Sequence, residues 1–281
     1  MSDMTQANEN VNQTEIYHPH NVSADPLFNI GEFVVTNSLF TSWIVVVFII
    51  ILCLFLNRSI KKIPGKIQNI FEMITEKFLE MFDSLTGSRE TSVKFFPFVF
   101  TFFLFILISN WMAIIPGFAS IGQVVEAQGQ KIFIPFTRGV MADVNTTLAL
   151  ALVGVTASHI IGVSYIGFWN YINKFINLEA MADIPRKMWK EPTVLLINPI
   201  KVFTGLIEIV SEVAKVASLS FRLFGNIFAG EVLLAVVAGF LAFGLPLPFL
   251  FLELLVGLIQ ALIFALLVLA YLVMMTTVQE H

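Results

Sequence analysis

The chain has 281 residues, 57% hydrophobic and 13% charged, with a mean hydropathy of +0.84 and a formal net charge of -4 at pH 7. These values place it among membrane proteins and exclude an ordinary soluble domain. Its basic residues lie in loops rather than in a patch interleaved with aromatic residues, and it has a single cysteine, Cys53, so neither nucleic-acid binding nor a disulfide framework is expected.

The chain begins with a polar stretch. Its first 37 residues contain no Lys or Arg, so they lack the basic start and the apolar core of a cleaved signal peptide. We therefore expect a retained polar tail at 1–37, followed by a single membrane domain at 38–281. His18, His20 and Asp25 in the tail do not make a convincing metal site, and the sequence predicts no metal or cofactor.

Three charge-free apolar segments follow the tail. Each is long enough to cross the ~30 Å hydrocarbon layer, which takes ~20 helical residues. The first lies near 38–57, and the second, near 95–115, is rich in phenylalanine and ends before Pro116. The third, near 145–168, follows directly on Asp143 and Val144. Each segment is predicted to be a membrane-spanning helix.

The segment between the first two spans is amphipathic. Its apolar residues recur at helical spacing on one face, and charged residues occupy the opposite face. The apolar members are Ile67, Ile70, Phe71, Ile74, Phe78, Met81 and Phe82, and the charged members are Glu72, Glu76, Lys77 and Glu80. Such a helix is predicted to lie on the membrane surface rather than to cross it.

The last third of the chain predicts two unusually long helices. Asn198-Pro199 is a helix-start signal and no proline follows until Pro246, so one helix could run over 199–239. At ~1.5 Å per residue it would be ~60 Å long, about twice the hydrocarbon thickness. A second helix near 247–277 poses the same problem, so we expect a long tilted hairpin packed against other protein. The predicted fold class is an all-α polytopic membrane protein with about five membrane helices and one interfacial amphipathic helix.

The distribution of Lys and Arg indicates orientation, because cytoplasmic loops retain an excess of them. Segment 57–94 contains seven, segment 168–192 contains four and segment 116–144 contains two, whereas the tail and the turn at 239–247 contain none. Five spans with an extracytoplasmic N terminus and a cytoplasmic C terminus satisfy every segment.

Charged residues form a stripe along the first long helix. The stripe comprises Lys201, Glu208, Lys215 and Arg222, spaced by seven residues, and Asn226 four residues later. At helical spacing all five fall within an arc of about 60°. Such a stripe is prohibitive in lipid, so it should face water or a partner with compensating charge. For Lys201 and Glu208, a solvated helix end is an equally good interpretation.

Arg222 is the most informative member of the stripe, because it lies inside an apolar run far from the ends of its predicted helix. A charge near the bilayer centre costs at least ~2.5 to 3.5 kcal/mol, and guanidinium does not avoid that cost by releasing its proton. A permanent positive charge in this position indicates function rather than structure alone.

Other polar residues also lie within the predicted spans. Glu231 follows Arg222 by nine residues, about half a turn round the helix, and so faces a different environment. Burial would favour a neutral carboxyl group at Glu231 and Glu253, and such a group is suited to proton exchange. A purely structural role for the two residues is the alternative interpretation. His159 in the third span could be a hydrogen-bonded interior residue or a relay member. One face of the last helix carries Glu253, Gly257, Gln260, Phe264 and Tyr271.

Several sequence runs carry a family resemblance. They are LSFRLFGNIFAGE at 219–231, QALIF at 260–264 and the closing QEH at 279–281. Further support comes from ADVNTT at 142–147 and PGK at 64–66. From residue 38 onward, and most strongly over its last third, the chain resembles subunit a of the F-type ATP synthase.

The resemblance implies a membrane stator that grips a ring of small subunits, each with one carboxyl group, and offers it two laterally offset aqueous half-channels. Arg222 matches the family's essential arginine, and Glu253 stands where one common bacterial pattern has histidine. The implied proton-translocation residues are Arg222, Asn226, Glu231, Glu253, Gln260, Glu208 and Asp143, with Lys215 and His159 as weaker candidates.

The same resemblance implies partners and a location. The partners would be the c-ring subunits, b-type peripheral stalk subunits, the remainder of the ATP synthase and the lipid bilayer, and the location would be the bacterial plasma (inner) membrane. The chain would translocate ions without being catalytic by itself.

The main alternative is a secondary ion transporter or channel, which would also contain charges within the membrane. Such a protein would assemble its site within this chain and would be active alone. An intramembrane enzyme is disfavoured, because the sequence contains no His-Glu-x-x-His zinc pattern, no phosphate-binding glycine loop and no convincing nucleophile paired with a base.

Overall fold

The structure is a computed structural model that describes residues 23–115, 117–127, 130–176, 194–240, 244 and 246–276. Five of its helices are long and apolar enough to cross a membrane. They are α2 (Asn37–Ser59), α4 (Arg89–Ile114), α5 (Val144–Ile166), α8 (Val194–Phe240) and α9 (Pro246–Thr276). This confirms the predicted class, an all-α polytopic membrane protein.

Two helices begin earlier than the sequence predicts. The second span begins at Arg89 rather than near residue 95, and this extra turn carries an ion pair of 2.8 Å between Lys94 Nζ and Glu90 Oε1. The first long helix begins at Val194, so Pro199 lies inside α8 rather than at its start. Hydropathy and proline signals therefore underestimate these helices, because charged or proline-containing turns extend them beyond the apolar run.

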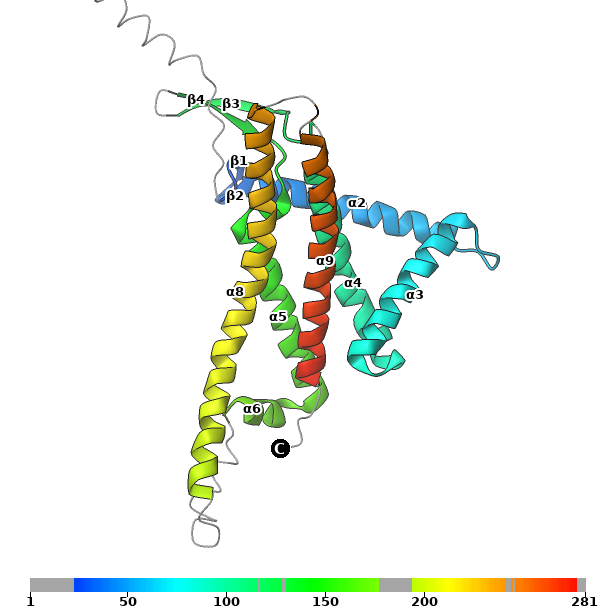
Figure 1. Cartoon of the computed structure of the whole chain (residues 1–281), viewed down its shortest axis with the longest axis vertical. Coiled ribbons are helices and arrows are strands. Elements are labelled where there is room, and N and C mark those ends of the chain that lie inside the picture. The colour runs from blue at the N-terminus through cyan, green and yellow to red at the C-terminus, as the bar shows by residue number, and fades with distance from the viewer. Residues whose placement is uncertain are drawn as a thin grey trace, which may run out of the picture.

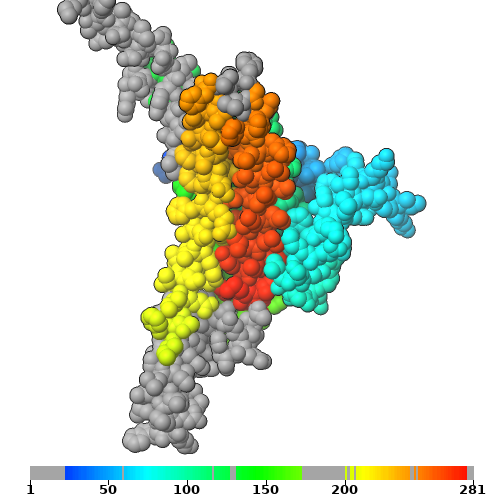
Figure 2. Space-filling model, in the orientation of Figure 1, coloured from blue at the N-terminus to red at the C-terminus, as the bar shows by residue number. Residues whose placement is uncertain are grey.

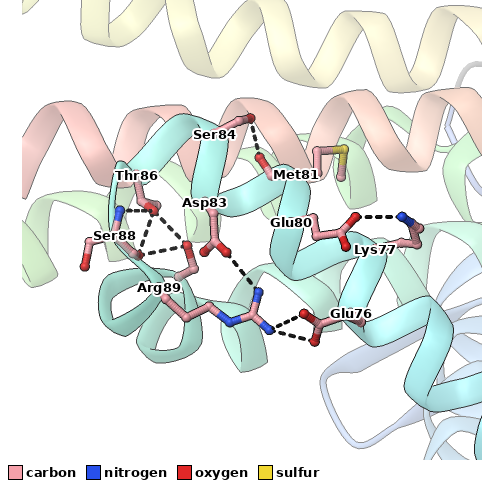
Figure 3. A network of polar contacts seen from close by, with 10 residues as sticks. Glu76, Lys77, Glu80, Met81, Asp83, Ser84, Thr86, Ser88 and Arg89 are labelled. Carbon is pink, nitrogen blue, oxygen red and sulfur yellow. Dashed lines mark hydrogen bonds and ion pairs between the residues drawn. The ribbon is translucent and has the colours of Figure 1, made fainter.

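The amphipathic segment is α3 (Lys66–Thr86), which packs beside α4 through its apolar face. Phe78 of α3 lies against Phe100 and Phe103 of α4, with ring centroids 5.1 and 4.6 Å apart. At the corner between the two helices, Arg89 donates hydrogen bonds to Glu76 and Asp83 (Figure 3). These exposed ion pairs link the end of α3 to the start of α4.

Two antiparallel hairpins, which the sequence analysis does not predict, lie near the end of the molecule where α8 and α9 meet (Figure 1). They are β1 (Pro26–Ile30) with β2 (Phe33–Thr36), and β3 (Gly122–Ala127) with β4 (Gln130–Pro135). The first lies within the tail predicted at 1–37 and is closed by a hydrogen bond of 3.0 Å from Asn37 N to Asp25 O. The tail thus ends in ordered structure that leads directly into α2.

The core lies where α4, α5 and α9 pack together. Phe102 of α4 meets Phe264 of α9 with ring centroids 5.6 Å apart, and Val268 of α9 lies against Gly154 of α5. A short 3-10 turn, η1 (Val140–Ala142), precedes α5, and α6 (Phe168–Ile176) follows it and contacts α8. The core therefore fixes α9, and α9 with α5 positions α8.

The long hairpin of α8 and α9 forms one open face of the molecule. Figure 2 shows the two helices side by side along this face, with α3 beside α9. In Figure 1, α2 runs crosswise to both helices of the hairpin. The 47 residues of α8 extend ~70 Å, more than twice the hydrocarbon thickness. With α2 upright in a membrane, α8 would be strongly tilted, as its length requires.

Candidate functional site

Gln260 of α9 joins the two long helices at the level of Arg222. Its Nε2 donates a hydrogen bond of 2.6 Å to the backbone carbonyl of Arg222, and its Oε1 accepts one of 2.7 Å from Asn226 Nδ2. Gln260 is buried, with 4% of its surface exposed. The structure thus brings together three of the predicted site residues and fixes the backbone from which Arg222 projects.

The side chain of Arg222 lies on the exposed surface of α8, as does that of its neighbour Phe221. In the part of the chain that the structure describes, its guanidinium group has no ion pair and no hydrogen bond. A cation on an apolar helix surface within a membrane needs a compensating charge. Arg222 is therefore placed to meet water or an acidic group supplied from outside this chain.

Glu231 opens onto a cavity of about 650 Å³ between α8 and the segments that carry the hairpins. Arg138 lines the same cavity and is buried, with 8% exposure and a hydrogen bond of 2.9 Å from Nη1 to the backbone carbonyl of Ser23. A Cβ atom on Gly139 would lie 2.5 Å from Glu231 Oε1, so glycine at this position leaves room for the carboxyl group where it lies, and a larger residue would push it aside. The cavity therefore places an acidic and a basic side chain together beside α8.

Arg138 is a site residue that sequence reasoning missed. The available signal was weak: it is one of two basic residues in segment 116–144, which is counted there only for orientation. Its proximity to Glu231, 93 residues later, depends on the packing of η1 against α8.

Glu253 of α9 lies against the same stretch of α8, beside Gly230. It is 7% exposed, and its carboxyl group fills the space beside Gly230 that a Cβ atom would take. A second cavity, of about 220 Å³, is lined by Glu253, Gly230 and Asn226. Polar groups thus continue from Glu231 through Glu253 to Asn226 and Gln260 along the contact between α8 and α9.

Asp143 is the N-cap of α5 and is almost fully buried, with 3% exposure. Its carboxylate accepts a hydrogen bond of 2.8 Å from Ser38 of α2 and others from Asn145 and Thr146 of α5. These bonds tie the start of α5 to the start of α2. The structure thus gives Asp143 a capping role, and its place in proton transfer stays a prediction.

Replacement of Asp143 with alanine is expected to lower the free energy of unfolding by about 1 kcal/mol or more. The change removes the N-cap of α5 and leaves buried hydrogen-bond donors without an acceptor. Asparagine also caps helices, so Asp143→Asn is the matched control and should retain most of that stability. Thermal unfolding of both variants in detergent measures the difference. Equal unfolding temperatures for the two variants would contradict the capping role.

A second buried polar cluster surrounds Lys215. Lys215 Nζ lies 2.6 Å from Glu212 Oε1 and 5.1 Å from the centre of the Tyr271 ring. His159 Nε2 lies 3.4 Å from Glu212 Oε2. The structure therefore brings the weaker candidates Lys215 and His159 together through Glu212, which sequence reasoning did not single out although it lies three residues before Lys215.

The predicted stripe does not face one environment. Arg222 and Asn226 are exposed, whereas the Lys215 side chain is only 13% exposed and turns toward Glu212. Glu208 is partly buried, and the side chain of Lys201 lies outside the described residues. The spacing by seven residues therefore predicted the helix correctly. It did not distinguish side chains on the exposed surface of α8 from side chains that turn toward the other helices.

A comparison with protein-family models gives one match, to the family described as ATP synthase A chain, over residues 39–273. The chain belongs to this family. The match includes the whole of α4, α5 and α8, most of α2 and α9, and the candidate site residues from Arg138 to Gln260. ATP synthase subunits a are non-catalytic, ion-translocating subunits, and this one is a multi-pass membrane protein.

The similar proteins align over most of this chain. One from Desulfotalea psychrophila, named ATP synthase subunit a, is 36% identical, and the alignment covers 85% of this chain and 83% of that protein. One of the same name from Syntrophobacter fumaroxidans is 33% identical, with coverage of 90% and 89%. A chloroplastic subunit a from Stigeoclonium helveticum is 30% identical, with coverage of 89% and 94%.

Proposed function

We propose that this chain is the proton-conducting stator subunit of a rotary F-type ATP synthase. The observation that carries the proposal is Arg222: an exposed, unpaired arginine, among the residues described, on the open face of α8, held in place by Gln260. A ring of small subunits, each with one carboxyl group, supplies the charge that this arginine lacks.

Elementary electrostatics gives Arg222 two tasks. A rotor carboxyl group faces lipid only when it is neutral, and it becomes ionised beside a fixed cation. Arg222 also repels a proton that would cross directly between the two half-channels, a leak that would bypass rotation. The membrane potential supplies ~2.3 kcal/mol per charge per 100 mV, and this drive does work only when the direct path is closed.

The polar groups next to Arg222 supply one of the half-channels. Protons enter the cavity lined by Arg138 and Glu231, pass to Glu253 and reach the rotor beside Asn226. Gln260 holds Asn226 in position through its hydrogen bond. Glu208 and Lys215 belong to the opposite half-channel, and Asp143 stands at the outer edge of the first.

The complex and its orientation complete the proposal. The c-ring covers the open face of α8 and α9, and b-type peripheral stalk subunits together with the remainder of the synthase hold the chain against rotation. The location is a bacterial plasma membrane. The tail at 1–37 is extracytoplasmic, the membrane domain at 38–281 follows it, and the C terminus is cytoplasmic, in agreement with the Lys and Arg counts.

A reconstitution experiment tests this function against a transporter or channel. The chain alone and the assembled complex are placed in proteoliposomes, and proton flux is measured with a pH-sensitive dye. The chain alone should give no flux above empty vesicles, because its Arg222 has no rotor carboxyl group opposite it. The assembled complex should acidify the vesicles when ATP is added. Ion flux through the chain alone would favour the transporter or channel.

Replacement of Glu231 with glutamine is expected to slow ATP-driven proton pumping severalfold without abolishing it. Glutamine keeps the size of the side chain but cannot carry a proton, while Arg138 and water in the wide cavity remain. Glu126→Gln, an exposed change on β3 near the same end of the molecule, is the control. A pumping rate equal to that of the control would remove Glu231 from the pathway.

A further inference from the structure

Four helices contribute to the buried cluster around Glu212. Glu212 and Lys215 come from α8, His159 from α5, Tyr171 from α6 and Tyr271 from α9. The hydroxyl group of Tyr171 contacts His159 Nδ1 and lies 3.5 Å from Met275 Sδ of α9. The acid therefore lies at a junction of helices, where its oxygens meet a lysine on one side and a histidine on the other.

Exposure increases along this cluster. The side chains of Glu212 and Lys215 are 12% and 13% exposed, and that of His159 is 28% exposed. Beyond His159 lies α6, a short helix whose residues Phe168 and Trp169 are exposed. A buried carboxyl group thus lies next to a titratable ring that is itself closer to the surface.

The cluster and the Glu231 site lie on opposite sides of Arg222. Glu212 precedes Arg222 by ten residues, or ~15 Å along α8, and Glu231 follows it by nine residues, or ~14 Å. The hairpins lie toward one end of the molecule and α6 toward the other (Figure 1). Two partly buried acids therefore flank the arginine at similar distances, each nearer a different end.

We propose that Glu212 is a proton-exchanging carboxyl group of the second half-channel, and that His159 passes the proton between Glu212 and water on the α6 side. This inference rests on the proposed stator function and adds to it a residue on the path. During ATP synthesis a rotor carboxyl group releases its proton to water, and the Glu212 carboxylate accepts the proton from that water. The proton then moves to Nε2 of the neutral His159 ring and from there to water, and Glu212 returns to its carboxylate form.

The neighbouring side chains hold Glu212 and His159 in the positions that this proton exchange needs. The Lys215 ammonium group holds Oε1 of Glu212 at 2.6 Å and leaves Oε2, the oxygen nearer His159, for the proton. Burial raises the pKa of Tyr171 to about 12, so its hydroxyl group keeps its proton at neutral pH and donates it to Met275 Sδ. The hydroxyl oxygen then accepts from Nδ1–H of the neutral His159 ring, and Nε2 is left without a proton and can accept one. The other titratable groups around Glu212 and His159 are Glu208 on α8 and Tyr271 on α9.

The test compares Glu212→Gln, Glu212→Asp and His159→Gln in the assembled complex in proteoliposomes. Passive proton conduction is measured while pH is varied on the α6 side alone. Glu212→Gln should lower conduction by at least about tenfold, and Glu212→Asp should restore most of it. His159→Gln should lower conduction and flatten its dependence on the pH of the α6 side. Glu80→Gln, an exposed change on α3, is the control.

A merely structural ion pair predicts a different result. If Glu212→Gln assembles and conducts as the control does, with an unchanged pH profile, the inference is overturned. If Glu212→Gln does not assemble, His159→Gln decides, and an unchanged pH profile in that variant overturns the inference. Arg222→Ala in the same vesicles separates this outcome from failure of the stator function, because it tests coupling and leaves Glu212 intact.

Discussion

Replacement of Arg222 with alanine is expected to abolish ATP-driven acidification by the assembled complex. The remaining dye signal should equal that of vesicles without the complex. The variant removes the cation that favours ionised rotor carboxyl groups at the stator. It also removes the barrier between the half-channels, so passive proton conduction should rise as pumping disappears. Fluorescence quenching of a pH-sensitive dye in inverted membrane vesicles measures both quantities.

Arg222→Lys is the informative companion to this variant. Lysine keeps a positive charge in water, but burial against a rotor strips its proton far more readily than that of guanidinium. We therefore expect Arg222→Lys to fail in coupling nearly as completely as alanine. Lys94→Ala, at an exposed ion pair at the start of α4, should pump normally. Normal acidification by Arg222→Ala would refute the assigned role of the arginine.

The spans and the amphipathic helix could be predicted from sequence because their signals are local. A run of apolar residues such as 38–57 predicts a membrane span regardless of the rest of the chain. The amphipathic pattern of α3 can likewise be recognised from the helical period of its apolar residues alone. The same holds for Arg222, whose cost within an apolar run can be judged without its neighbours. Local chemistry thus gave the fold class and the central residue of the candidate site.

The remaining site residues depend on contacts between distant segments. From sequence alone, Glu212 is one more charge along α8. It becomes a candidate because α5 brings His159 to 3.4 Å from its carboxyl group. From sequence alone, Arg138 is a loop residue. It becomes a site residue because η1 packs against α8 beside Glu231. The hairpins were missed for a related reason: short strands are marginal alone and form here where they close over the helix ends.

Gly230 gives a prediction that depends on the observed packing rather than on the sequence. A Cβ atom at residue 230 would lie 2.6 Å from Cδ of Glu253, and it would lie closer still to Oε1 of the same carboxyl group. Because Glu253 is a flexible side chain, Gly230→Ala should fold and assemble with the carboxyl group pushed out of place. Displacement of a reacting group by about 1 Å costs up to ~100-fold in rate, so we expect ATP-driven pumping to fall roughly tenfold or more.

Gly239→Ala is the matched control, because it makes the same change on the same helix where no atom lies within 4 Å of the added methyl group. Both variants replace glycine with a better helix former, a gain of at most ~1 kcal/mol that is smaller for Gly239 in the last turn of α8. A gain in helix propensity does not explain slower pumping, so a loss of rate in Gly230→Ala alone reports the position of Glu253. Adding Glu253→Asp to Gly230→Ala shortens the displaced side chain by one methylene and should recover part of the lost rate. If Gly230→Ala pumps as fast as Gly239→Ala, the carboxyl group of Glu253 is not needed where the structure places it, and the path from Glu231 to Asn226 must run through water alone.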